Sequence, residues 1–118
     1  MTVALVVACG LAATASAAKT VDSQLHVAKV FSVPSGTAIG FGTVTSPDKR
    51  CVDNRKVTMR IEHGDESEIF DVGRTGKNGG WQVRGQADSF AESTAIFVIL
   101  APKRVGKVKC GGMKLGLA

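Results

Sequence analysis

The sequence predicts an all-β protein: a single antiparallel β-sandwich of about six to seven short strands with one disulfide, preceded by a cleavable signal peptide. Three observations lead to this fold class. Short runs that alternate apolar and polar residues recur between turn signals. No long stretch repeats apolar residues with the period of a helix. The chain holds 14 glycines and only 3 prolines, which is typical of turns between strands.

The first 18 residues contain no charged side chain. They run from an apolar stretch into small residues, which is the pattern of a secretory signal with a small-x-small cleavage site. We therefore expect cleavage after Ala17 or Ala18 and a secreted, extracellular or cell-envelope protein. No basic residue precedes the apolar run, which departs from the usual pattern. The alternatives are a lipoprotein signal ending at Cys9, which would bring the protein to a membrane, and an uncleaved anchor or no signal.

The mature chain divides into two predicted parts. Residues 19–36 mix apolar and polar side chains and end in a Pro-Ser-Gly turn signal, so they form an N-terminal extension or an edge strand. Residues 37–118 form the β-sandwich domain. Its first strand, at 37–46, places Ile39 and Phe41 on one face and glycines on the other.

The segment at 56–61 has the clearest strand pattern in the chain. Val57, Met59 and Ile61 alternate with polar residues, so we expect these three side chains to point inward. A polar, acidic loop at 62–68 follows and should lie at the far end of this strand.

The next strand is predicted at 69–74, where hydrophobicity favours Phe70 and Val72 as the inward residues. An Asn-Gly pair at 78–79 then indicates a tight turn, because these residues tolerate the positive φ angles that such turns require. Trp81 opens the strand after that turn and is expected to anchor the core.

Residues 86–93 are expected to form a longer loop, with a short helix at 86–95 as the alternative. The most apolar run of the mature chain, at 93–101, is rich in β-branched side chains and is followed by Pro102. It predicts a central strand covered on both faces. A last short strand carries Val108 and Cys110.

The cysteines predict a disulfide. Removal of the signal would take Cys9 away and leave Cys51 and Cys110, and an even pair in an exported chain is typical of a disulfide. Closing so long a loop stabilises a fold by about 4 kcal/mol. A metal site or a catalytic thiol is disfavoured, because neither cysteine has another cysteine or a histidine within five positions.

Basic residues gather near both cysteines. A disulfide holds its Cα atoms about 4.4–6.8 Å apart, so it would bring the two basic segments to one end of the domain, away from the acidic loop. The alternative is that these charges keep the domain soluble and protect strand edges. The predicted patch for an anionic partner consists of Lys49, Arg50, Arg55, Lys103, Arg104, Lys107 and Lys109.

The segments GTVTSPDKRCVDNRKVTM, TGKNGGWQV and AIFVILAPKRVGKVKCGG carry a family pattern. They resemble small secreted bacterial β-sandwich domains of the transthyretin-like, carboxypeptidase-regulatory-like class. The matching positions are Gly42, Val44 and Ser46, then Cys51, Arg55 and Val57, then Thr75, Gly79 or Gly80 and Trp81, and finally Cys110.

The resemblance extends from Phe41 to Gly112 and has two clear departures. Gly76 stands where this class usually has Asp, and Phe97 stands where Tyr is common. The class implies a β-sandwich that is generally non-catalytic and serves as an accessory, adhesive or structural module. Motifs of this kind, which consist of turn residues and a pair of cysteines, indicate a fold but do not identify a binding partner.

No catalytic or cofactor motif is found in the sequence. We therefore expect a non-enzymatic module without cofactor or metal, whose partner is an anionic cell-wall polymer or a surface protein. With one Trp, no Tyr and five Phe, the chain is not expected to bind nucleic acid specifically. The alternative is a small secreted enzyme inhibitor, or an enzyme with a loop-borne site.

Overall fold

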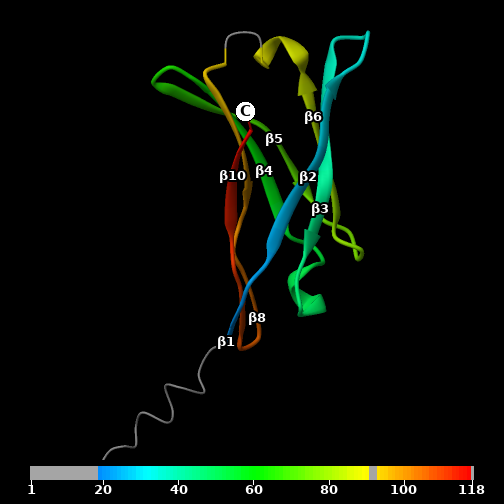
Figure 1. Cartoon of the computed structure of the whole chain (residues 1–118), viewed down its shortest axis with the longest axis vertical. Helices are drawn as coiled ribbons and strands as arrows, with labels where there is room; N and C mark the ends of the chain where they lie inside the picture. The colour runs from blue at the N-terminus through cyan, green and yellow to red at the C-terminus, as the bar shows by residue number, and fades with distance from the viewer. Residues whose placement is uncertain (1–18, 91–92, 118) are drawn as a thin grey trace, which may run out of the picture.

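The computed structural model describes residues 19–90 and 93–117, and most of this part of the chain lies in strands (Figure 1). The expected signal peptide, residues 1–18, lies outside the described residues. The only helical elements described are two short 3₁₀ turns, η1 at Lys49–Cys51 and η2 at Ala87–Phe90. The predicted all-β class is confirmed, and the described part of the loop expected after the Trp81 strand contains the short turn η2.

The described strands form three sheets, with orders β2–β3–β6, β10–β7–β4–β5 and β1–β9–β8. The first two are antiparallel, whereas β1 runs parallel to β9. The described strands are more numerous than the six to seven predicted, because segments near both ends of the described chain form several very short strands. The strands are β1 (Lys19–Val21), β2 (Gln24–Ser32), β3 (Thr37–Thr45), β4 (Lys56–His63), β5 (Glu66–Arg74), β6 (Gly80–Gln86), β7 (Ala95–Leu100), β8 (Lys103–Val105), β9 (Val108–Cys110) and β10 (Met113–Leu117).

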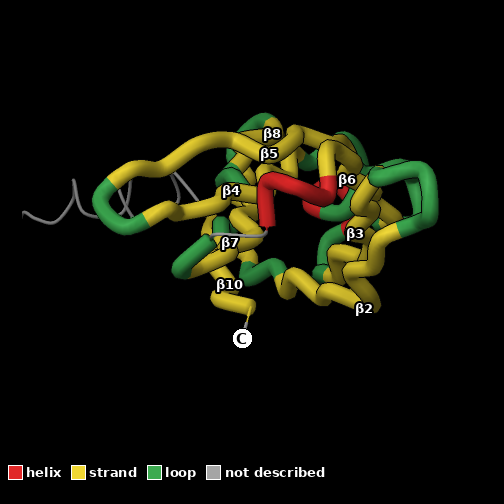
Figure 2. Tube along the Cα trace, turned by 90° about the horizontal axis from the view of Figure 1, so that it is seen from above, coloured by secondary structure: helices red, strands yellow, loops and turns green. Residues whose placement is uncertain are grey.

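The two larger sheets enclose a common hydrophobic core, and Figure 2 shows them on opposite sides of the molecule. The expected inward residues of β4 are all buried, which confirms the alternation seen in the sequence. Trp81 is buried in the same core. The buried members of the core are Leu25, Val44, Val57, Met59, Trp81, Val83, Val98 and Leu100.

Glycines on the inner face of β3 let the sheet β2–β3–β6 pack closely against its neighbours. A Cβ atom on Gly40 would lie 2.9 Å from the Met59 Cε, and one on Gly42 would lie 2.9 Å from the Trp81 ring. The Met59 Cε atom is the end of a flexible side chain and could shift, whereas a Cβ atom on Gly42 would also collide with the backbone carbonyl of His26, so the inner face requires glycine at position 42. The larger side chains of β3, including Phe41, consequently lie on the outer face.

The strand β5 departs from its predicted alternation. Its register with β4 shifts between Met59 and Arg60, which is the sign of a β-bulge. Phe70 packs against the core and stacks on Phe90 with ring centroids 4.8 Å apart, as its inward assignment required. Val72 is 41% exposed, so its predicted inward position is wrong. Because of the bulge, Phe70 and Val72 point to opposite faces of the sheet although they are two residues apart.

The most apolar strand, β7, lies between β10 and β4 and is therefore central, as expected. Only its inner face is fully covered, with Val98 and Leu100 buried. Phe97 and Ile99 on the opposite face are half-buried, which corrects the prediction of cover on both sides. Lys114 of β10 partly shields Phe97, with its Nζ 4.2 Å from the ring centroid.

Candidate anion-binding site at the disulfide end

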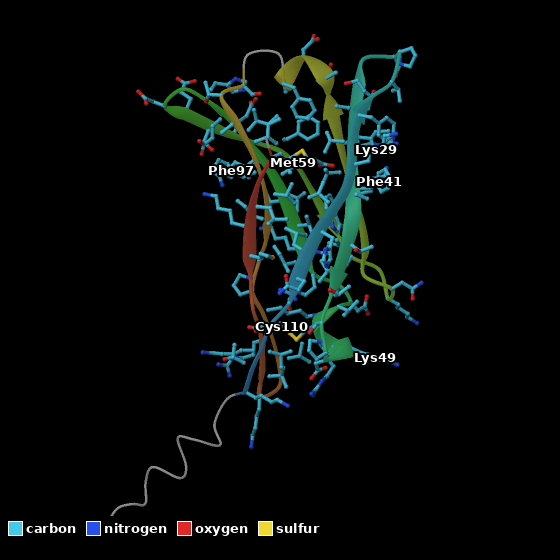
Figure 3. All side chains as sticks on the ribbon, viewed as in Figure 1. Lys29, Phe41, Lys49, Met59, Phe97 and Cys110 are labelled. Carbon is cyan, nitrogen blue, oxygen red and sulfur yellow. A yellow bond between two sulfur atoms is a disulfide. The ribbon has the colours of Figure 1, made fainter. Side chains whose placement is uncertain are left out.

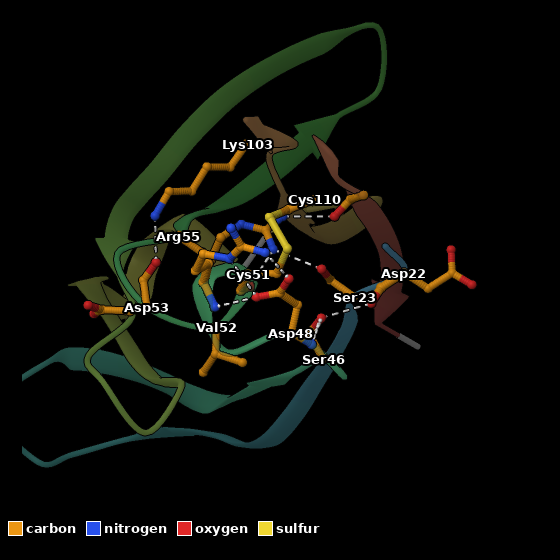
Figure 4. Close-up of a disulfide and its surroundings, with 12 residues drawn as sticks. Asp22, Ser23, Ser46, Asp48, Cys51, Val52, Asp53, Arg55, Lys103 and Cys110 are labelled. Carbon is orange, nitrogen blue, oxygen red and sulfur yellow. Dashed lines mark hydrogen bonds and ion pairs between the residues drawn. A yellow bond between two sulfur atoms is a disulfide. The ribbon is translucent and has the colours of Figure 1, made fainter. Parts of the chain in front are cut away.

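A disulfide joins η1 to β9, as Figure 4 shows. Cys51 and Cys110 are bonded with their Cα atoms 5.3 Å apart, which confirms the predicted pairing. Both cysteines are buried and pack with Val21 and Val108 in a small second core. The bond therefore anchors the sheet β1–β9–β8 to the turn that leads into β4.

Arg55 lies behind this disulfide and is completely buried. Its Nη1 donates to Ser23 Oγ at 2.9 Å and to the Cys51 carbonyl at 2.7 Å. Its Nη2 donates to the carbonyls of Ala101 and Gly111, both at 2.8 Å. One guanidinium thus joins the nearby Cys51 turn, four residues earlier, to groups 32, 46 and 56 positions away in the sequence. The prediction that Arg55 belongs to an exposed patch is wrong.

The four groups that receive the Arg55 side-chain hydrogen bonds are uncharged. Its backbone N–H donates to Thr75 Oγ1 at 2.7 Å, which fixes the start of β4 against the end of β5. Burial lowers the pKa of the Arg55 guanidinium, because desolvation disfavours the charged form. Arginine nevertheless stays protonated at neutral pH. Oriented carbonyl dipoles therefore compensate this buried charge, which otherwise would be costly.

The outer face of the small sheet carries a transverse row of three exposed polar residues. Thr20 of β1 lies opposite Lys109 of β9, and Lys109 lies opposite Arg104 of β8. Like charges directly opposite each other on neighbouring strands are destabilising. We call Thr20, Lys109 and Arg104 the cationic row. It combines two closely spaced positive charges with a hydroxyl group.

The cationic row borders an open hollow of about 500 Å³, whose wall also includes Pro102 and Lys103. Thr20 was absent from the predicted patch because nothing near it in the sequence indicates its neighbour. Its position depends on parallel pairing with a strand at the other end of the chain. Arg104 and Lys109 both belong to the predicted patch, as members of the basic segment before Cys110, but their cross-strand pairing was not predicted.

Two of the other predicted cations have partners within the protein. The Lys103 ammonium donates to the Asp53 carbonyl at 2.8 Å, and Arg50 forms a salt bridge of 2.8 Å with Asp48. Hydrogen bonds from the Arg50 side chain and backbone lower the pKa of Asp48 to about 2. This carboxylate is therefore ionised at neutral pH and offsets the charge of Arg50.

Lys49 and Lys107 are exposed at the same end. A second open hollow is lined by Lys49, Arg50 and Lys103, so η1 and β8 do meet there, as the disulfide argument required. The β4–β5 hairpin, whose sequence carries Glu62, Asp65, Glu66 and Glu68, lies at the opposite end of the molecule (Figure 1). The protein is therefore electrically asymmetric along its length.

Other kinds of site find no support in the described residues. Within residues 19–90 and 93–117, His, Cys, Asp and Glu side chains nowhere gather in threes as a metal site would need. The same part of the chain has no helix long and apolar enough to cross a bilayer. Comparisons with protein-family models, curated proteins and solved structures give no match. The geometry of the disulfide end is therefore the basis for a functional proposal.

Proposed function

We propose that the chain is a secreted, non-enzymatic β-sandwich module of the cell envelope or extracellular space that binds an anionic polymer through the cationic row. The two larger sheets are the layers of the sandwich, in keeping with the transthyretin-like resemblance of the sequence. The observation that carries the proposal is the pairing of Arg104 opposite Lys109, beside the open hollow. An anionic partner would relieve the repulsion between these two cations.

The chemistry of the row suits carboxylate or phosphate groups. The planar guanidinium of Arg104 can donate two parallel hydrogen bonds to either group, and Lys109 adds a point charge. Neighbouring strands lie about 4.8 Å apart, so the three side chains of the row span about 10 Å. A polymer with a negative charge on each monomer would meet both cations at once. The exposed setting implies an attraction that salt weakens.

The scaffold behind the row supports such a role. Val21 and Cys110 face the interior directly beneath it, and the disulfide and Arg55 hold that interior together. The row is thus presented by a braced sheet, which reduces the ordering cost of binding. A disulfide also persists in oxidising compartments, which supports the proposed secretion.

The test compares two single charge reversals in the mature protein. Binding to polygalacturonate and to polyphosphate is measured by biolayer interferometry at two salt concentrations. We expect Lys109→Glu to weaken binding about tenfold, the loss of one close charge contact. The matched control is Lys114→Glu, which changes net charge equally on an exposed strand position of another sheet. Its effect should be less than about twofold.

Two results would contradict the proposal. One is binding of neither polymer at low salt, where electrostatic attraction is strongest. The other is an equal loss in both variants, since it would mean that the polymers sense only the net charge of the protein.

A further inference from the structure

The outer face of the sheet β2–β3–β6 carries an aromatic cluster. Phe41, at the middle of β3, is 38% exposed and meets Phe31 edge to face, with centroids 6.3 Å apart and planes at 84°. Ile39 lies opposite Phe31 and completes the cluster. Figure 3 shows Phe41 and Lys29 on the side of β3 that faces away from the four-stranded sheet.

Hydrogen-bonding side chains surround these rings. Phe41 lies between Lys29 on β2 and Gln82 on β6, and the neighbouring pair places Arg84 beside Ile39. Thr43 follows Phe41 on the same face of the strand. The cluster is therefore an apolar centre within a polar rim, an arrangement that marks binding surfaces.

The three strands of this sheet contain no Asp or Glu, although the chain has ten acidic residues. One carboxylate from another sheet, that of Asp71 on β5, contacts this sheet. It accepts a hydrogen bond from the Arg84 backbone N–H at 2.9 Å, at the edge of the sheet. The face thus offers amides, hydroxyls and two permanent cations, and its own strands bring no carboxylate to it.

We infer that this face binds a linear glycan whose sugar rings pack against Phe41. The negative face of an aromatic ring attracts the C–H groups of a pyranose. The amide of Gln82 and the hydroxyl of Thr43 can donate to and accept from sugar hydroxyls. Lys29 and Arg84 would add contacts to ring oxygens, or to carboxylates where the glycan carries them.

Two features favour a glycan over single-stranded nucleic acid. Consecutive bases need rings that can stack in succession, whereas Phe31 and Phe41 are almost perpendicular, and the Lys29 Nζ lies 5.5 Å over the Phe31 ring. One nucleic-acid strand also brings a phosphate with every nucleotide. The face has only two permanent cations, one on each outer strand. A second copy of the face is disfavoured as well, because its strands would bring no acidic group to those cations.

This inference goes beyond the cationic row and does not depend on it. The two surfaces belong to different sheets. Contacts to sugar hydroxyls and an aromatic ring are insensitive to salt, whereas binding at the cationic row is screened. A failure of one proposal therefore leaves the other to be judged by its own variants.

The test is isothermal titration calorimetry of the mature, disulfide-bonded protein at physiological salt. The probes are three uncharged hexasaccharides, cellohexaose, chitohexaose and xylohexaose, and a ten-residue oligothymidylate. We expect at least one hexasaccharide to bind, and Phe41→Thr to weaken that binding at least about tenfold, as loss of a central aromatic contact does. The matched control is Val72→Thr, which removes an exposed apolar residue from the outer face of the other sheet. This variant should bind like the wild type.

The inference is overturned if none of the three hexasaccharides binds. It is also overturned if oligothymidylate binds more tightly and loses binding in Phe41→Thr, since the face would then accept nucleic acid. Thermal unfolding checks that Phe41→Thr is folded. If it is not, Gln82→Ala is used, which alters an exposed neighbour of Phe41 and should weaken glycan binding about threefold. Unchanged binding in the folded variant contradicts the inference.

Discussion

The two ends of the molecule carry opposite charges and are held together by different means. At the basic end, the disulfide and the hydrogen bonds of Arg55 tie η1, β4, β9 and the neighbouring turns. At the acidic end, the β4–β5 hairpin extends from the sheet and is held by strand pairing and by Thr94, whose Oγ1 accepts from the Gly64 N–H at 3.1 Å. Only the basic end has a covalent link among the described residues.

The strongest stabilising interactions therefore lie at the basic end, and the charges of the two ends explain why. The hairpin carries spaced acidic residues that water can solvate, and Glu68 contacts the His63 Nε2 at 3.1 Å, so strand pairing and such local contacts are sufficient there. The basic end places Lys109 opposite Arg104 on strands only three residues long. Such short strands have few ladder hydrogen bonds to resist repulsion, so their stability must come from the interior that they cover.

The strongest way to break this comparison is to remove the disulfide. Cys51→Ala with Cys110→Ala should lower the free energy of unfolding by about 4 kcal/mol, because the bond closes a long loop. Urea denaturation monitored by Trp81 fluorescence measures the change. Hydrogen exchange should show β1, β8 and β9 losing protection before the β4–β5 hairpin. A loss of protection that begins in the hairpin would contradict the proposed role of the bond.

The second test separates the buried arginine from an exposed one. Arg55→Met keeps much of the side-chain volume but leaves Ser23 Oγ and three carbonyls without their donor, so we expect a loss of about 3 kcal/mol. Arg104→Met is the matched control and should change stability by less than about 0.5 kcal/mol. Chemical denaturation of both variants measures the difference. Similar losses in the two would show that Arg55 is not the centre of this end.

The smallest expected effect sharpens the comparison by its sign. Lys109→Glu replaces a repulsive cross-strand pair with an attractive one, so it should raise the free energy of unfolding by about 0.5 kcal/mol while it weakens anion binding. At the acidic end, Glu66→Lys should change stability by less than that. Thermal unfolding at low salt measures both. A destabilised Lys109→Glu variant would mean that the row is not under electrostatic strain.

Much of the fold follows from local sequence. The alternation of Val57, Met59 and Ile61 predicted β4 and its inward face, and the paired cysteines predicted the disulfide. The burial of Arg55 was missed, although a signal was present. Arg55 precedes Val57 by two positions and so shares the inward parity of that strand. A basic residue beside other basic residues was instead assigned to the surface.

The remaining features depend on contacts between distant segments. The bulge that turns Val72 outward arises from the register between β4 and β5, which no single strand encodes. Thr20 joins the cationic row only through its pairing with Lys109. The outer face around Phe41 gathers residues from three strands that are separated by turns and by two other strands. Single-sequence periodicity identifies such strands but does not say which of them become neighbours.

The parallel pairing of β1 with β9 has a consequence for the order of assembly. Lys19 lies opposite Val108, so the first described strand waits for a partner near the other end of the chain. Contacts between such distant residues carry a large loop-closure cost, and they form slowly until intervening structure brings the ends together. In a chain that emerges from a channel with its amino end first, this small sheet cannot close until the last cysteine has emerged.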